Sequence, residues 1–184
     1  MAPASISNYV DILGNIANNV IPVQLLISGC AYMLGILFVV KALMTLKEHG
    51  EQRTMMSQKN SMKEPLVYFI VGGMLFYSPT GFRALLETMY GSNASIMAYG
   101  PLSKNTPFSG PFLNNSAAGA SLVKIIQTIG LVAFVRGWIL VARAGSQGQA
   151  PGGMGKGMIH VLGGVLAINI VGTIDMINNT LYGT

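Results

Sequence analysis

The sequence is poor in charge and in the side chains that bind metals or carry catalysis. Only 9% of its 184 residues are Asp, Glu, Lys or Arg, whereas soluble domains average about 25%. It has two histidines and one cysteine, Cys30, which lies inside an apolar run. A single cysteine can form neither an internal disulfide nor a multi-cysteine metal site. These shortages exclude an ordinary water-soluble domain and a cysteine-based metal fold.

Recognisable catalytic motifs are also lacking. The segment APGGMGKG, residues 150–157, has the glycines of a phosphate loop, but Gly157 stands where that motif needs Ser or Thr. His160 has no second histidine, cysteine or carboxylate at metal-ligand spacing. The sequence therefore predicts that the chain is not an enzyme, with no catalytic residue, no metal site and no cofactor. Its apolar segments are compatible with bound phospholipid.

What the sequence does contain is apolar residues in long runs. Hydrophobic residues make up 51% of the chain, and its mean hydropathy is +0.53. A membrane helix needs about 20 apolar residues, so 184 residues leave room for about four spans. We therefore predict an all-α integral membrane protein that forms one membrane domain over residues 1–184. The expected membrane helices cover residues 22–46, 65–89, 117–142 and 157–182.

Two proline positions refine this prediction. Apolar residues recur at helical spacing over residues 5–20, which predicts a short amphipathic helix on the membrane surface. Pro22 then marks the start of the first span. Pro79 and Gly81 should kink the second span, because proline removes a backbone donor that the bilayer cannot replace. The N-terminus has no basic region followed by an early apolar stretch, so we expect no cleavable signal peptide.

The distribution of lysine and arginine predicts the orientation. Five basic residues occupy the first predicted loop and its edges, namely Lys41, Lys47, Arg53, Lys59 and Lys63. Arg143 and Lys156 flank the third loop, the Gly-rich residues 143–156, whereas the second loop, residues 91–116, has only Lys104. Basic loops stay in the cytoplasm. We therefore expect a multi-pass protein of the bacterial inner membrane, with both termini and residues 91–116 in the periplasm.

The sequence contains what looks like one helical hairpin twice. GILFVVK at Gly35 aligns with GLVAFVR at Gly130, an offset of 95 residues. IVGGML at Ile70 aligns with VLGGVL at Val161, offset by 91, and TMYGS at residue 88 aligns with TLYGT at residue 180, offset by 92. Because each unit has two spans, both copies would share one orientation, which makes a parallel repeat. Chance similarity between Gly-rich apolar helices remains the alternative.

Small residues are spaced for close helix contacts, within one subunit or between subunits. The small-x-x-x-small pairs and the paired glycines comprise Gly29, Ala31, Gly35, Gly72, Gly73, Ala133, Gly137, Gly163, Gly164 and Ala167. Substitution of Gly35 or Gly137 by Leu is expected to break the assembly.

Ionisable residues at membrane depth need a partner or a wet surface. Arg83 and Glu87 are four residues apart and can pair with each other. Glu87, Lys124 and Asp175 fall near the periplasmic ends of their spans and could form a polar cluster, with a proton or ion pathway as the functional alternative. Arg136 lies deeper, where anionic lipid or a partner protein is favoured over a pore.

The chain resembles the IcmC/DotE family in three stretches. They are IPVQLLISGCAYMLGILFVVKAL from residue 21, IQTIGLVAFVRGWILV from residue 126, and the Gly-Gly final span. The landmark residues of this resemblance are Pro22, Gln24, Ser28, Gly29, Gly35 and the run from Phe134 to Gly137. The family comprises small inner-membrane components of type IVB secretion systems, the Dot/Icm apparatus and its relatives on conjugative plasmids. No catalytic residue comes with the resemblance.

Three functions follow as hypotheses. The first is a structural inner-membrane subunit of a type IVB secretion or conjugation machine, which transfers protein or DNA across the envelope. The second is a pilin-like subunit of a conjugative or secretion pilus, which would place the chain in an extracellular filament, and the third is a small ion or solute transporter. Expected partners are membrane lipids, further copies of the chain and other secretion-system subunits. The scattered basic residues predict no direct sequence-specific binding of nucleic acid.

Overall fold

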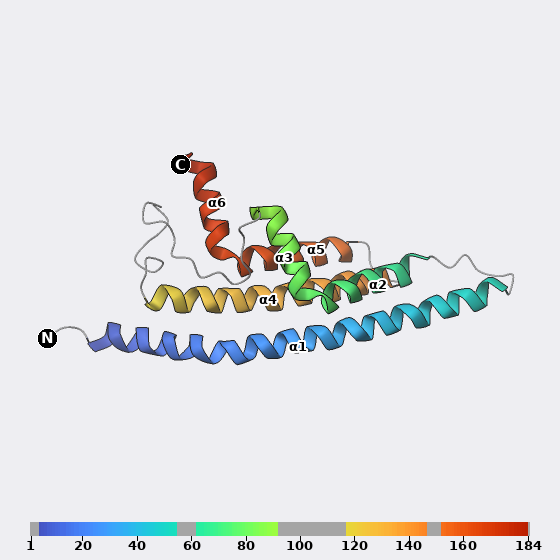
Figure 1. The fold of residues 1–184 in the computed structure, drawn as a ribbon, viewed down its shortest axis with the longest axis horizontal. Helices are drawn as coiled ribbons and strands as arrows, with labels where there is room; N and C mark the ends of the chain where they lie inside the picture. Colours follow the sequence, from blue (N-terminus) through green and yellow to red (C-terminus); the bar gives the residue numbers. More distant parts are fainter. Residues whose placement is uncertain (1–3, 55–61, 92–116, 147–151, 184) are drawn as a thin grey trace. The chain divides into compact units, whose positions relative to one another are not determined.

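The computed structural model describes residues 4–54, 62–91, 117–146 and 152–183, and every regular element in these ranges is an α-helix (Figure 1). The helices are α1 (Ala4–Thr54), α2 (Lys63–Phe76), α3 (Ser78–Tyr90), α4 (Ala117–Gly145), α5 (Gly153–Ile168) and α6 (Ile170–Tyr182). The predicted all-helical fold is confirmed. The predicted loop 91–116 lies outside the described residues, apart from Gly91.

The chain divides into two compact units. The first comprises Met1–Leu26, Phe82–Val132 and Gly164–Thr184. The second comprises Ile27–Gly81 and Ala133–Gly163. Each unit therefore draws on both halves of the sequence.

Helix α1 is longer than the sequence suggested. Its 51 residues include Pro22, so the surface helix predicted over residues 5–20 and the first span form one continuous helix (Figure 1). Pro22 removes one backbone hydrogen bond but does not end the helix. The polar segment after Leu46 also continues as helix to Thr54, because Lys, Glu, Gln and Arg are good helix formers.

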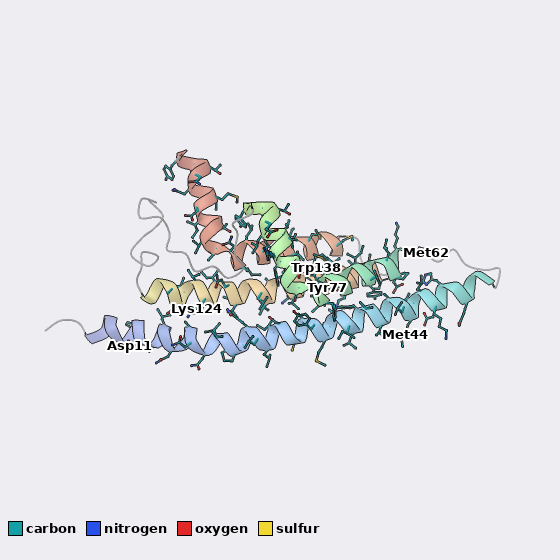
Figure 2. The ribbon with its side chains drawn as sticks, in the orientation of Figure 1. Asp11, Met44, Met62, Tyr77, Lys124 and Trp138 are labelled. Carbon is teal, nitrogen blue, oxygen red and sulfur yellow. The ribbon has the colours of Figure 1, made fainter. Side chains whose placement is uncertain are left out.

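Two helix pairs are sharply bent. The chain turns by 90° between α2 and α3 and by 92° between α5 and α6. The first break, at Tyr77, agrees with the kink expected near Pro79 and Gly81 (Figure 2). The second break, at Asn169, was not expected. There the Asn169 side chain accepts a hydrogen bond from the backbone N–H of Gly172 at 3.3 Å, which caps the start of α6.

Helices α3 and α6 share the same length and the same C-terminal cap. Helices α3 and α6 both have 13 residues and both end at a tyrosine. In each, a glycine with positive φ follows, Gly91 at 87° and Gly183 at 65°. The N–H of each glycine donates to the carbonyl four residues earlier at 3.0 Å. Two helices thus end with the same left-handed glycine cap, 92 residues apart.

The two helix breaks, at Tyr77 and Asn169, are also 92 residues apart. The N–H of Tyr77 donates to the carbonyl of Gly73 at 2.9 Å, and the N–H of Asn169 donates to the carbonyl of Val165 at 3.2 Å. Both pairs are related by 92 residues. The sequence alignment that placed Ile70 opposite Val161, with an offset of 91, is therefore one residue out of register.

Much apolar surface is left uncovered. Buried side chains include Leu86, Val165 and Ile168 in the first unit, and Val71, Leu75 and Phe134 in the second. By contrast, helix α1 exposes Leu25 at 71% and Met33 at 68%. By length and composition, two helices of the described part of the chain can each cross a membrane, or up to four spans exist if each bent pair counts as one. An apolar exterior of this kind belongs in lipid rather than in water.

Candidate functional site

In the first hairpin, α1 and α2 cross at a pair of glycines within the second unit. A Cβ atom added at Gly35 would lie 2.6 Å from the backbone nitrogen of Phe76 and 3.0 Å from the carbonyl oxygen of Gly72. A Cβ atom at Gly72 would lie 2.9 Å from the nitrogen of Val39. These obstacles are backbone atoms, which cannot rotate away, so only glycine fits at either position.

The second hairpin has the corresponding crossing, within the first unit. A Cβ atom at Gly130 would lie 2.9 Å from the carbonyl oxygen of Gly164 and 2.8 Å from the nitrogen of Ile168. Gly130 corresponds to Gly35 at an offset of 95, and Gly164 corresponds to Gly72 at 92. Gly130 was missed as a packing residue, although its alignment with Gly35 could have indicated it.

A further crossing lies about two turns away along α4 and α5, in the second unit. A Cβ atom at Gly137 would lie 2.6 Å from the nitrogen of Val161 and 2.9 Å from the carbonyl oxygen of Gly157. A Cβ atom at Gly157 would lie 2.8 Å from the nitrogen of Val141. Helices α4 and α5 therefore approach backbone to backbone at two places along their length.

The remaining small residues divide into two groups. Ala31 is buried, Ala133 and Ala167 are partly buried, and the Ala167 methyl group lies 2.8 Å from a Cβ atom added at Gly130. Around Gly29, Gly73 and Gly163 there is no atom within 4 Å of an added Cβ atom. These three glycines face open space.

A polar contact joins α1 and α4 within the first unit. The Gln24 side-chain amide donates to the Thr128 hydroxyl at 2.7 Å, and that hydroxyl donates to the Lys124 carbonyl at 2.9 Å. Gln24 is one of the landmarks of the family resemblance. It therefore lies at a helix contact, as do Gly35 and Gly137.

The end of α3 meets α6 within the first unit. The Thr173 hydroxyl lies 2.8 Å from the carbonyl oxygen of Leu166 and 2.9 Å from that of Asn169. Its single proton goes to a carbonyl, so it accepts from the Tyr90 hydroxyl at 2.6 Å. Beside this contact lies a cavity of about 520 Å³ lined by Met89, Tyr90, Gly172, Asp175, Met176, Asn179 and Thr180.

The predicted pair of Arg83 and Glu87 forms, whereas within the described ranges no ion pair joins Glu87, Lys124 and Asp175, the predicted polar cluster. Arg83 Nε donates to Glu87 Oε1 at 2.8 Å on the exposed face of α3. Lys124 and Asp175 are partly buried, and among the described residues neither forms an ion pair. Arg136 is exposed on α4. Within these ranges no group of three His, Cys, Asp or Glu side chains could hold a metal ion.

Most of the basic residues assigned to the first loop are helical instead. Lys41 and Lys47 are exposed on α1, where Lys41 Nζ lies 4.5 Å from the centre of the Tyr68 ring. Arg53 is in the last turn of α1 and Lys63 is the first residue of α2. Lys59 lies outside the described residues.

These features define an α-helical membrane protein built from a duplicated hairpin, in which glycines bring the helices into backbone contact. Comparison with models of protein families, with curated proteins and with solved structures finds no match.

Proposed function

We propose that the protein is a structural subunit of the inner-membrane part of a type IVB secretion or conjugation apparatus. The supporting observation is where the landmarks of the family resemblance fall. Gln24 bonds to Thr128, Gly35 crosses Gly72, and Gly137 crosses Gly157. Three of the residues that carry the resemblance thus lie at helix contacts, as expected of a protein whose role is to assemble.

The exposed surface favours assembly as well. Helix α1 presents Leu25, Met33, Leu37 and Met44 on its outside, each more than 60% exposed. In this proposal, lipid and neighbouring subunits cover these side chains. Both termini face the periplasm, and the basic ends of α1 and α2 face the cytoplasm.

The test is recovery of the complex from cells that express the whole secretion system. A tagged copy should fractionate with the inner membrane and co-purify with other subunits of the apparatus, and transfer of cargo should stop when the gene is deleted. A deletion strain with normal transfer would remove the proposal. Gly73→Leu, which changes an open position, is the matched control for Gly35→Leu in the same purification.

The pilin alternative is favoured by the same exposed apolar side chains, because copies packed in a filament would also cover them. Shearing the cells separates the two functions. Protein retained in the inner membrane supports the fixed subunit, whereas abundant protein in the released filaments supports the pilin.

The transporter alternative depends on the cavity beside Asp175. Substitution of Asp175 by Asn together with Lys124 by Gln would abolish flux if these groups form an ion pathway. Normal flux through an intact double variant would exclude this function.

A further inference from the structure

We propose that the first hairpin carries a binding site for one acyl chain of an anionic phospholipid, in an apolar groove. The groove lies between α1 and α2 within the second unit. Its lining is almost wholly apolar and comprises Ala42, Leu43, Leu46, Met62, Pro65, Leu66 and Phe69. Its volume is about 400 Å³, in the range of about 300–1,000 Å³ that is typical of small-molecule sites.

Comparison with the second hairpin explains why α1 and α2 stand apart at this groove. By the offsets of 95 and 92 residues, Ala42 corresponds to Gly137 and Pro65 corresponds to Gly157. In the second hairpin these two glycines bring α4 and α5 into backbone contact, and nothing fits between them. In the first hairpin a methyl group and a proline ring stand in place of two hydrogen atoms. The helices cannot close in the same way, and apolar space remains.

The size of the groove favours a flexible chain over a helix as its occupant. One wall is a single turn of α1, from Ala42 to Leu46, and the other is Met62 with the first two turns of α2, as far as Phe69. A helix with side chains is about 10 Å across and needs several turns of contact. Leu43, Leu66 and Phe69 are 56%, 60% and 57% exposed, so the groove opens to the side.

Charge beside the groove favours an anionic headgroup. Lys41 precedes Ala42, Lys47 follows Leu46, and Lys63 follows Met62. The Lys47 side chain is 77% exposed, and its Nζ lies 3.7 Å from Glu51 Oε1. An ion pair that is this long and this exposed holds the lysine only weakly. Lysine stems lie along apolar surface and deliver the ammonium group to the headgroup region. An acyl chain in the groove would thus place its phosphate among these lysines.

This lipid site requires only that the protein resides in a membrane, and it is independent of a role in secretion. The experiment is native mass spectrometry of the purified full chain titrated with phosphatidylglycerol or phosphatidylcholine. We expect one tightly bound phosphatidylglycerol. Leu66→Trp, which fills the groove from its exposed rim, should weaken binding at least tenfold, whereas Leu37→Trp, on an exposed α1 position outside the groove, should not.

The headgroup contribution is tested with lysine variants. Lys47→Gln and Lys63→Gln should each weaken binding of phosphatidylglycerol about fivefold and leave phosphatidylcholine unchanged, whereas Lys156→Gln, in the second hairpin, should have no effect. Equal affinity for the two lipids overturns the proposal, as does binding that Leu66→Trp leaves intact. A dimer that Leu66→Trp dissociates would show that a second copy occupies the groove, and would also overturn it.

Discussion

Gln24 and Thr128, which are 104 residues apart in sequence, are joined by a hydrogen bond of 2.7 Å. We expect Gln24→Leu and Thr128→Val to lower the free energy of unfolding in detergent. A double-mutant cycle should give a coupling energy of about 0.6 kcal/mol, a usual value for polar contacts between membrane helices. The measurement is unfolding in a denaturing detergent titration. Additive effects of the two changes would mean that the contact does not contribute to stability.

Tyr90 and Thr173 fix the end of α3 to α6. Tyr90→Phe removes one donor and should cost about 1 kcal/mol. Thr173→Val should cost more, because it also leaves the carbonyls at the break before α6 without their hydroxyl donor. Hydrogen exchange at the start of α6 reports the effect. Faster exchange in Thr173→Val than in Tyr90→Phe is expected, and the reverse order would contradict the assigned direction of the bond.

The glycine crossings give the largest expected effect. Gly35→Leu and Gly137→Leu place side-chain atoms where backbone already lies, and each should destabilise by about 3 kcal/mol or more. Gly73→Leu and Gly163→Leu are matched controls on the same two hairpins, because their surroundings are open. Thermal unfolding in detergent should therefore separate the variants into two pairs. Equal loss of stability in all four would argue against backbone contact at the crossings.

The bends predict a change in solvent exposure along each bent pair. Arg83 is 70% exposed and shares one face of α3 with Glu87 and Thr80, so this face cannot lie in hydrocarbon. On a Cys30→Ser background, Thr88→Cys should react readily with a membrane-impermeant maleimide, whereas Phe69→Cys on α2 should be protected.

The second hairpin provides the matching comparison. Thr180→Cys on α6 should be labelled and Leu162→Cys on α5 should be protected. Protection of Thr88→Cys and Thr180→Cys would mean that each bent pair crosses the lipid along its whole length.

The Arg83 and Glu87 pair should matter little to stability. An exposed ion pair four residues apart on a helix contributes about 0.3–0.5 kcal/mol. Glu87→Gln should therefore change the unfolding midpoint only slightly, and the residual effect should disappear at high salt. A large loss would indicate that Glu87 has a second partner.

Composition and periodicity predicted the fold class because the bilayer leaves few alternatives to a helix. The third span, residues 117–142, agrees with α4 to within three residues. Helix α1 continues through the boundary placed at Pro22, since a proline in a long helix costs one hydrogen bond and neighbouring turns can hold it. Likewise, the helix continues past Leu46, because the loss of hydrophobicity there marks a change of environment and not of backbone conformation.

The break at Asn169 could not be predicted from local sequence, since neither α5 nor α6 contains a proline. The repeat holds the information, because Tyr77 and Asn169 correspond at an offset of 92, yet an alignment in error by one residue hides that match. The same error pairs Gly164 with Gly73. The true counterpart of Gly164 is Gly72. The polar cluster was overestimated because closeness to one end of a span does not bring two side chains into contact.

The length of α1 has a consequence in a lipid bilayer. At 1.5 Å per residue, its 51 residues extend for about 76 Å, whereas the hydrocarbon core of a bilayer is about 30 Å thick. A helix perpendicular to the bilayer would therefore have more than half of its length outside the hydrocarbon core. The part of α1 outside the hydrocarbon would then be available to contact lipid headgroups or neighbouring proteins.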